Sequence, residues 1–466
     1  MKVFTAIVAL VSASFIFASN QPRSTPADNG ESSLSVREVV MKVLDAISAD
    51  SIHTYDLKLV SFGTRHTMSD TTSPTRGIGA ARNWIASKFM RFASSNENFE
   101  VYRDEFVQPV SPRISVPTKI VNVYGILWGK EGPTGRYIVL SGHYDTIVGN
   151  FMDSTADAPG ADDDGSGSSL VIEAARAFTE SGFRPDANIV FLCCAAEEQG
   201  LYGSHHFAEM AKKNNWNIVA DLNNDIVGGT HGGNRVLDNS RIRVFSESMK
   251  EVAVGDRKIP ASVFGYESDS PSRELARYIH QNVKTYLPEF KTELVFRSDR
   301  FLRGGDHTSF NQFGYAGVRF TEPNEDYNHQ HQYVRVENGV QFGDLPQFVD
   351  PQYIAKVCKV NSATAALLSV SPREPQDPVM LVDKLDYGTR LKWKNPLSED
   401  VSGWKVYYRE TMDPLWTSYV FVPAASGTDE VDANLPELSK DKFIFGISAV
   451  GTNGTESPVV VPIPER

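Results

Sequence analysis

The chain has 466 residues, of which 41% are hydrophobic and 22% are charged, and its net charge at pH 7 is −12. This is the composition of a globular protein, and the length exceeds what one hydrophobic core usually serves, so two domains are expected. The negative charge argues against nucleic acid or an anionic membrane as a partner, because both require a basic face. Three cysteines, two of them adjacent, do not make a disulfide scaffold.

Residues 1–19 are predicted to be a signal peptide. Lys2 provides a charged start, Val3 to Phe17 is nearly all apolar or small, and polar residues follow from Ser19. The apolar run is too short to span a bilayer comfortably, and no later segment approaches the necessary length. We therefore expect a secreted or periplasmic protein without a membrane span, and a retained amphipathic anchor is the second interpretation.

Residues 20–370 are expected to form the first domain. Apolar residues at helical spacing predict helices at residues 36–47, 77–92, 271–286 and 353–370. Strands are expected at residues 137–140, 189–196, 218–226 and 316–320, with helices between them at residues 168–178 and 203–214. The alternation predicts an α/β fold, with a mixed, mostly parallel sheet flanked by helices.

Residues 371–378 (SPREPQDP) carry three prolines and are predicted to be a linker. From residue 379 to residue 466 the pattern becomes that of short strands, including Trp393 with its neighbours, WKVYYR and FIFGISAV, separated by Gly, Asn and Pro turns. These features predict a small all-β sandwich domain that resembles a fibronectin type III domain. Its role is open between contact with a surface or a polysaccharide, spacing, and stabilisation of the first domain.

Chemically active side chains follow the first predicted strand of the sheet. His143 and Asp145 stand two residues apart just beyond it, so they leave the strand on the same side. A triple aspartate, Asp162 to Asp164, then opens the next helix in the loop GADDDGSG. Helix capping and the helix dipole stabilise negative charge there, which is one interpretation. In the other, one of the three carboxylates points into a shared site and bridges two cations.

Further acids follow the next two predicted strands. Glu197 and Glu198 leave the apolar run at residues 189–196, where uncompensated negative charge is costly. Consecutive side chains diverge, so one of these glutamates is able to bind a metal while the other handles a water. Asp225 stands at the corresponding end of the following strand, and His307 lies in the Gly-rich loop RGGDHTSF.

Together these positions predict a metal site near the carboxyl ends of the strands, where open α/β sheets build their sites. The candidate ligands are His143, Asp163, Glu198, Asp225 and His307. Nitrogen and oxygen ligands without thiolate favour Zn²⁺, with Mn²⁺ or Co²⁺ as alternatives. Five ligands exceed what one tetrahedral ion with an open position needs, so two ions that share a bridging aspartate fit better.

The motifs SGHYD, GADDDGSG, AAEEQGLYGS, NNDIVG and GGDHTSF occur in this order over roughly residues 33–370. They resemble the motifs of the co-catalytic di-zinc aminopeptidases, the family of the bacterial leucine aminopeptidases, with glutamate carboxypeptidase II and the glutaminyl cyclases as wider relatives. The resemblance implies two zinc ions per chain. His143 and Asp225 would bind one, Glu198 and His307 would bind the other, and Asp163 would bridge both.

The same resemblance implies roles for two further residues. Asp145 would orient His143 from behind, and Glu197 would be the general base that takes a proton from the attacking water. The implied activity is that of an aminopeptidase acting on peptides with a free N-terminus. A carboxypeptidase or another amide hydrolase of the family is the alternative, and a catalytically inactive secreted binding protein is the alternative from another class.

The chain departs from the commonest family pattern in two places. His307 is preceded by GGD, where a Ser-Asp lead-in is frequent, and NEDYNHQHQ (residues 324–332) replaces the usual Tyr-His-x-x-x-Asp-Thr run. Tyr327, His329 and His331 within this segment either line the substrate pocket or belong to a hydrogen-bonded loop at the domain junction. Both interpretations stay open.

Overall fold

A computed structural model describes residues 34–384, 386–395, 400–425 and 430–465 of the chain. The predicted signal peptide at residues 1–19 lies outside the described residues. Residues 35–466 form one compact unit. In the described part of the chain, no helix is both long enough and apolar enough to cross a membrane.

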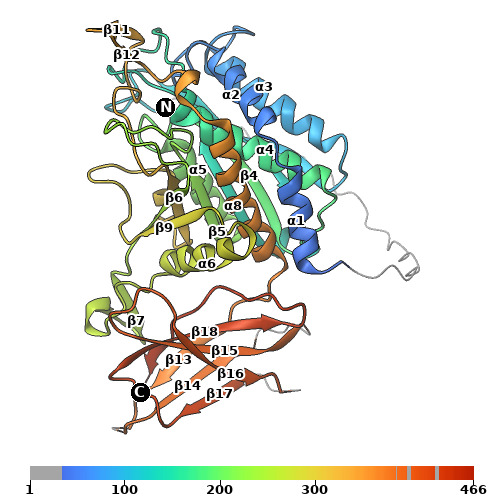
Figure 1. The fold of residues 1–466 in the computed structure, drawn as a ribbon, viewed down its shortest axis with the longest axis vertical. Coiled ribbons are helices and arrows are strands. Elements are labelled where there is room, and N and C mark those ends of the chain that lie inside the picture. Colours follow the sequence, from blue (N-terminus) through green and yellow to red (C-terminus); the bar gives the residue numbers. More distant parts are fainter. Residues whose placement is uncertain (1–33, 385, 396–399, 426–429, 466) are drawn as a thin grey trace, which may run out of the picture. The chain divides into compact units, whose positions relative to one another are not determined.

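An eight-stranded mixed sheet organises the first part of the chain (Figure 1), with the strand order β1-β2-β4-β3-β5-β10-β6-β9. The strands are β1 (Phe99–Gln108), β2 (Thr118–Leu127), β3 (Arg136–His143), β4 (Asn188–Cys194), β5 (Asn217–Asn224), β6 (Arg241–Ser246), β9 (Lys291–Val295) and β10 (Gly317–Thr321). At its centre, β3 runs parallel to β4 and β5, and β5 runs parallel to β10. The predicted mixed α/β fold is confirmed.

Helices cover both faces of this sheet. They are α1 (Val36–Ala46), α2 (Ala49–Val60), α3 (Gly77–Ala93), α4 (Gly167–Glu180), α5 (Tyr202–Lys213), α6 (Pro271–Tyr286), α7 (His307–Gln312) and α8 (Pro351–Val370). Of these, α4 and α8 pack on β3, whereas α7 packs on β5 and α5 on β2 (Figure 1). The predicted helices at residues 36–47, 77–92, 271–286 and 353–370 correspond to α1, α3, α6 and α8. Helix α2 and the antiparallel strands β1 and β2 were not predicted.

The alternation of side chains along β3 divides the interior into two apolar cores. Ile138 and Leu140 point into the larger core with α4 and α8, while Tyr137 and Val139 point into a smaller one with α5. Successive residues of a strand face opposite sides of a sheet, so a strand covered on both faces must be apolar throughout. Every residue of β3 and β4 is buried.

The C-terminal strands form two small sheets, one mixed and one antiparallel. Their orders are β17-β14-β13-β19 and β16-β15-β18, from β13 (Gln376–Leu381), β14 (Thr389–Lys394), β15 (Val401–Glu410), β16 (Ser418–Pro423), β17 (Glu430–Leu435), β18 (Phe443–Gly451) and β19 (Ile463–Glu465). Both sheets contribute to one core, in which the rings of Trp393 and Trp404 meet edge to face at 5.8 Å. The first strand begins inside the predicted linker, and the fibronectin type III resemblance stays a prediction.

A buried charged cluster joins β15 to the start of α6. Arg409 pairs with Asp269, and Arg277 Nη1 lies 3.2 Å from the same carboxylate. Trp416 donates a 2.8 Å hydrogen bond to Glu274. Asp269 is fully buried and Arg409 is 1% exposed, so neither charge is compensated by water. Removing one member therefore leaves the other charges partly unpaired.

We expect Arg409→Ala to lower the free energy of unfolding by about 3 kcal/mol, because the Asp269 carboxylate loses a buried partner. Urea unfolding followed by tryptophan fluorescence measures this value. The control is Lys392→Ala, which removes a half-buried residue of the same domain with a 42% exposed side chain and should cost less than about 1 kcal/mol. Equal losses in the two variants would contradict the structural role given to the buried cluster.

Candidate metal centre

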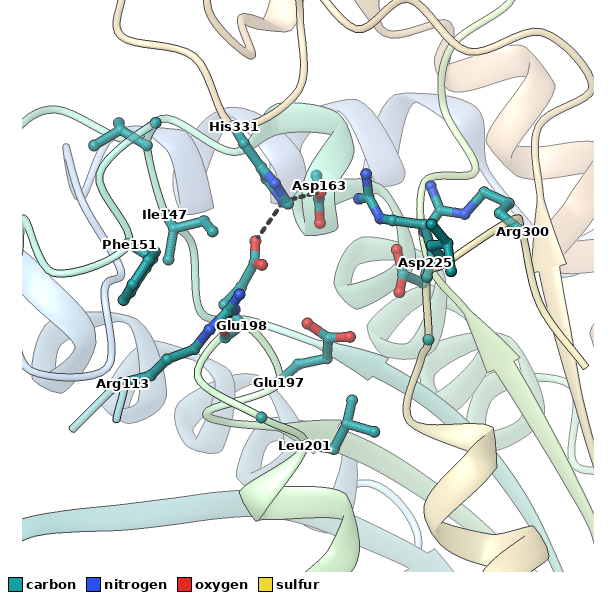
Figure 2. Close-up of a pocket in the computed structure, with 16 residues that line it drawn as sticks. Arg113, Ile147, Phe151, Asp163, Glu197, Glu198, Leu201, Asp225, Arg300 and His331 are labelled. Atoms are coloured by element: carbon teal, nitrogen blue, oxygen red, sulfur yellow. Dashed lines mark hydrogen bonds and ion pairs between the residues drawn. The ribbon is translucent and has the colours of Figure 1, made fainter. Parts of the chain in front are cut away.

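Three parallel strands deliver the candidate residues to one edge of the sheet. Strand β3 ends at His143, β4 ends at Cys194 shortly before the two glutamates, and β5 ends just before Asp225. The backbone N–H of Tyr144 donates to the carbonyl of Cys194 at 2.9 Å, which keeps the first two strand ends together. Figure 2 shows Glu197, Glu198, Asp163 and Asp225 around one cavity, as expected for the carboxyl edge of such a sheet.

Six buried or half-buried side chains form two adjacent groups. His143, Glu197 and Asp225 make the first group, and Asp163, Glu198 and His331 make the second. Within each group, the ligand atoms lie within 4.8 Å of one another. Sequence reasoning found five of these six residues, and the structure brings those five together.

Asp163 lies between the two groups and faces both. Its Oδ1 is 3.2 Å from Nε2 of His143, and its Oδ2 is 2.9 Å from Nε2 of His331. Nε2 of His331 is also 3.0 Å from Glu198 Oε1, and Nε2 of His143 is 3.9 Å from Asp225 Oδ2. One carboxylate therefore presents one oxygen to each group, which is the geometry that a bridge between two cations requires.

His307 is not part of either group, so the structure does not support the prediction that it is a zinc ligand. It is buried at the start of α7, where its Nε2 contacts the backbone carbonyl of Ser298 at 2.8 Å. With Nε2 donating to that carbonyl, the lone pair of the ring is on Nδ1, which is buried without a hydrogen-bond partner among the described residues but joins neither group. The motif lies beside the site in sequence order, but the helix that follows it turns the imidazole towards the protein backbone.

His331 occupies the position for which His307 was predicted. It belongs to the segment NEDYNHQHQ, which follows β10, the neighbour of β5 in the sheet. Its side chain reaches back to Asp163 and Glu198 across the cavity (Figure 2). The sequence signal was present as a histidine-rich segment beyond a core strand, but nothing in the local pattern selects His331 over His329.

Asp145 holds residues of both groups in place through hydrogen bonds. Its two carboxylate oxygens accept hydrogen bonds from the backbone N–H groups of Glu197 and Glu198, each at 3.2 Å. Nδ1 of His143 lies 3.2 Å from the backbone carbonyl of Asp145 and 3.6 Å from its carboxylate. With a proton on Nδ1, the Nε2 atom of His143 is left free to face Asp163 and Asp225.

Hydrogen bonds to the backbone determine which member of the triple aspartate is free. Asp162 accepts from Gly228 N at 2.8 Å, and Asp164 accepts from His143 N at 2.9 Å. Asp344, which sequence reasoning did not single out, accepts from the N–H groups of Asp162 and Asp163 at 2.8 and 2.7 Å. The outer two carboxylates are therefore structural, and that of Asp163 remains for the site.

Arg319 holds Asp225 in place and was also not predicted. Its Nη2 is 2.7 Å from Asp225 Oδ1, and its Nη1 is 3.0 Å from Asp299 Oδ2. Burial lowers the pKa of Arg319, but Asp225 and Asp299 outweigh this effect and raise the pKa above its usual value. The permanent charge directs one oxygen of Asp225 away from the cavity and leaves the other for the first group.

The clustered carboxylates of the two groups need positive charge to balance them. Burial raises the pKa of Glu197 well above its usual value and raises that of Glu198. Burial opposes the charged form of His331, but Glu198 and Asp163 raise the pKa of this imidazole to about 11. Four clustered carboxylates thus draw protons onto the imidazoles wherever no cation balances them.

The donor set fits zinc. Nε2 of His143, Nε2 of His331 and Oε1 of Glu198 are buried, and none of them makes a hydrogen bond within the described residues. The two imidazole nitrogens lie 2.9–3.2 Å from carboxylate oxygens, and Glu198 Oε1 is one of these oxygens. Imidazole and carboxylate donors without thiolate are those of catalytic zinc sites. Unpartnered donor atoms that face one another are what such a site needs.

All residues of the two groups except His143 line the floor of a cavity of about 450 Å³. Apolar side chains, including Ile147, Phe151 and Leu201, form part of its wall (Figure 2). The remaining charged wall residues are Arg113, Arg300 and Arg303. A cavity of this size falls within the roughly 300–1,000 Å³ of sites for small ligands.

Residues 122–333 match peptidase family M28, and this span contains all six residues of the two groups. A probable zinc metalloprotease of Leptosphaeria maculans is 42% identical over 431 residues, which is 92% of this chain and 97% of the relative. A probable zinc metalloprotease of Pyricularia oryzae is 44% identical over 414 residues, covering 87% of this chain and 81% of the relative.

Solved structures share the α/β fold. The LapA aminopeptidase of Legionella pneumophila superposes with a TM-score of 0.54 at 20% identity, over 74% of this chain and 79% of that one. A leucine aminopeptidase precursor from Bacteroides thetaiotaomicron superposes with a TM-score of 0.50 at 17% identity, over 69% of this chain and 97% of that one.

We expect His331→Ala to bind less zinc than the wild type, because the second group loses its only imidazole, whereas His307→Ala should retain the wild-type zinc content. Inductively coupled plasma mass spectrometry on dialysed protein measures the difference. Circular dichroism on the same samples shows whether each variant is folded. Loss of zinc from folded His307→Ala with full retention in His331→Ala would reverse the assignment of the two histidines.

Arg319→Gln should weaken zinc binding by about 10- to 100-fold, because Asp225 loses the partner that orients it. Competition with a chromophoric chelator measures the affinity. Arg335→Gln is the matched control, since Arg335 lies near the site in sequence but pairs with Glu337 outside the two groups. Unchanged affinity in a folded Arg319→Gln protein would show that Asp225 is positioned by its backbone alone.

Proposed function

We propose that this chain, which belongs to peptidase family M28 and is a zinc metallopeptidase like the relatives named probable zinc metalloproteases, is a secreted aminopeptidase with two zinc ions per chain. The observation that carries the proposal is the position of Asp163, whose two oxygens face the imidazoles of His143 and His331 at 3.2 and 2.9 Å.

The residues present would hold two ions in separate but linked positions. His143 and Asp225 would bind one, Glu198 and His331 would bind the other, and Asp163 would contact both. Zinc bound in such a pair polarises the scissile carbonyl and lowers the pKa of the attacking water. Asp145 would keep His143 in the tautomer that leaves Nε2 free, through the contacts of its backbone carbonyl and carboxylate with Nδ1.

Glu197 is the residue we assign as general base. It belongs to the first group, and its side chain lines the cavity next to Leu201 (Figure 2). Its backbone N–H is held by Asp145, and its side chain faces the cavity. From there Glu197 would accept a proton from the attacking water and deliver it to the departing amine.

A free N-terminus suits the acidic floor of the cavity. The α-ammonium of a peptide is a cation of the size that carboxylates pair with, and Asp163, Glu198 and Asp225 all line this floor. Two solved proteins with the same fold are named aminopeptidases, which supports removal of N-terminal residues. An inactive binding protein is less favoured, because both groups keep a complete set of donors.

Export is part of the proposal and is supported by the sequence of residues 1–19. The described part of the chain adds no contrary feature, since its cysteines are buried free thiols that do not depend on an oxidising compartment. For the C-terminal sheets, contact with a surface or a polysaccharide remains a proposal. It is supported by the exposed side chains of Tyr419 and Phe421, which lie two residues apart on the edge strand β16.

We expect Glu197→Gln to reduce kcat on leucine p-nitroanilide by about 10²- to 10⁴-fold while the zinc content stays at the wild-type level, because the amide cannot accept a proton. Release of p-nitroaniline measures the rate, and mass spectrometry measures the metal. Wild-type kcat in the folded, zinc-loaded variant would remove Glu197 from the mechanism.

N-acetylation of a peptide substrate should abolish cleavage if the enzyme requires a free amine. Chromatography of the products from matched free-amine and N-acetylated peptides shows which end is shortened. Loss of C-terminal residues from the acetylated peptide would replace aminopeptidase action with carboxypeptidase action at the same site.

A further inference from the structure

The cavity wall above the two groups carries charge of one sign. Every charged side chain that lines the cavity outside the two groups is an arginine: Arg113, Arg300 and Arg303. The whole chain has a net charge of −12, so this local excess of positive charge runs against the overall composition. A wall built only of guanidinium groups selects for anions, and carboxylates and phosphates are their usual partners.

Two of the three arginines are open for such a partner. Arg300 is occupied, because its Nη1 pairs with Glu325 at 2.6 Å and its Nε lies 3.4 Å from Asp299. Arg113 and Arg303 are exposed, and neither has a carboxylate within ion-pair distance among the residues that the structure describes.

Arg113 is positioned by its surroundings and still points into the cavity. Its Nη1 donates a 2.6 Å hydrogen bond to the backbone carbonyl of Glu198, and its guanidinium lies over the ring of Phe151, 4.7 Å from the ring centre. Figure 2 shows Arg113 beside Phe151 and Glu198, on the opposite side of the cavity from Arg300. These contacts use one nitrogen and one face of the guanidinium and leave other donors for a ligand.

Arg303 stands on a turn whose base is anchored. Asp299, at the beginning of the turn, pairs with Arg319, and the carbonyl of Gly304, at its end, accepts a 2.6 Å hydrogen bond from the same arginine. The backbone N–H of Arg303 donates to the carbonyl of Arg300 at 3.2 Å. The turn is therefore fixed to the residue that orients Asp225, while the Arg303 side chain is left free at the cavity wall.

The balance of charges in the cavity explains why its wall would bind an anion. The floor supplies four carboxylates, and two divalent cations would neutralise them, as the proposed function requires. The two open guanidinium groups would then leave the loaded cavity with a net positive charge. A peptide that carries a carboxylate beyond its N-terminal residue would supply the anion that balances this positive charge.

We propose that Arg113 and Arg303 recognise a carboxylate of the substrate, so that the enzyme prefers short peptides carrying a free C-terminal carboxylate or an acidic side chain next to the cleaved residue. The inference rests on the proposed aminopeptidase function and adds a substrate class to it. Recognition of the carboxylate lies outside the metal groups and does not alter the assigned ligands.

The test compares three peptides with a free amine: Leu-Ala-Ala, its C-terminal amide, and the C-terminal amide of Leu-Asp-Ala. The zinc-loaded wild type should cleave at least one of the two carboxylate peptides with a kcat/KM about tenfold above that of the Leu-Ala-Ala amide, which corresponds to about 1.4 kcal/mol. Whichever carboxylate peptide shows the preference identifies its source. A wild-type ratio near one overturns the inference.

Variants assign the preference to the two arginines. Arg303→Gln or Arg113→Gln should reduce the ratio of carboxylate to amide kcat/KM by about tenfold, and 0.5 M NaCl should reduce the wild-type ratio because exposed charges are screened. Arg257→Gln, an exposed arginine on the hairpin of β7 (Glu251–Val254) and β8 (Arg257–Pro260), is the matched control and should retain the ratio. Retention of the ratio in both cavity variants overturns the inference.

Calorimetry separates this inference from the proposed function. Zinc-loaded Glu197→Gln protein is titrated with the same three peptides, so that binding is measured without turnover. A Kd about tenfold lower for a carboxylate peptide than for the Leu-Ala-Ala amide supports carboxylate recognition even if the wild type cleaves none of the peptides. Equal Kd values for all three peptides overturn it even if the wild type is an active aminopeptidase.

Discussion

The carboxylate of Asp163 stands between two imidazoles, and the surrounding structure is arranged to keep it there. Its oxygens face His143 and His331 at 3.2 and 2.9 Å, which leaves neither oxygen for a structural role. The backbone that carries it is held instead by Asp344, which accepts hydrogen bonds from two consecutive N–H groups. The edge of the parallel sheet supplies His143 from one side, and the segment after β10 supplies His331 from the other.

Clustering four carboxylates in a buried place is unfavourable unless their charge is met. The protein meets part of it with Arg319, which pairs with Asp225, while backbone N–H groups bind the neighbouring carboxylates of Asp145, Asp162 and Asp164. The remaining negative charge is balanced by the imidazoles. Glu198 and Asp163 raise the pKa of His331 to about 11, although burial opposes its charged form. Zinc would take over this charge, which gives a physical reason for the metal that the family relationship indicates.

Acidic and basic side chains lie at different depths of the cavity. Its floor is acidic and suits cations, whereas its wall carries Arg113, Arg300 and Arg303 between apolar side chains. The base of the 299–304 turn is tied to Arg319, and Arg319 is tied to Asp225, so the wall and the floor share one anchoring residue. A peptide that enters with its ammonium towards the floor would meet the guanidinium groups further along, so under the proposed function the two parts of the cavity would impose one direction on the substrate.

The sequence by itself determined the α/β fold and most of the site, because each of His143, Glu198 and Asp225 follows an apolar strand and parallel strands end at one edge. The role of Asp163 was predictable from the sequence as well, because only one of three consecutive carboxylates is able to face a shared site. Helix α2 and strands β1 and β2 were not predicted. The histidine of the second group depended on the tertiary structure: His307 and His331 both lie in polar loops, and local pattern does not show that His307 faces the carbonyl of Ser298 at 2.8 Å. Arg319 and Asp344 support the site from 94 and 181 residues away along the chain, and such long-range hydrogen bonds exist only once the chain has folded.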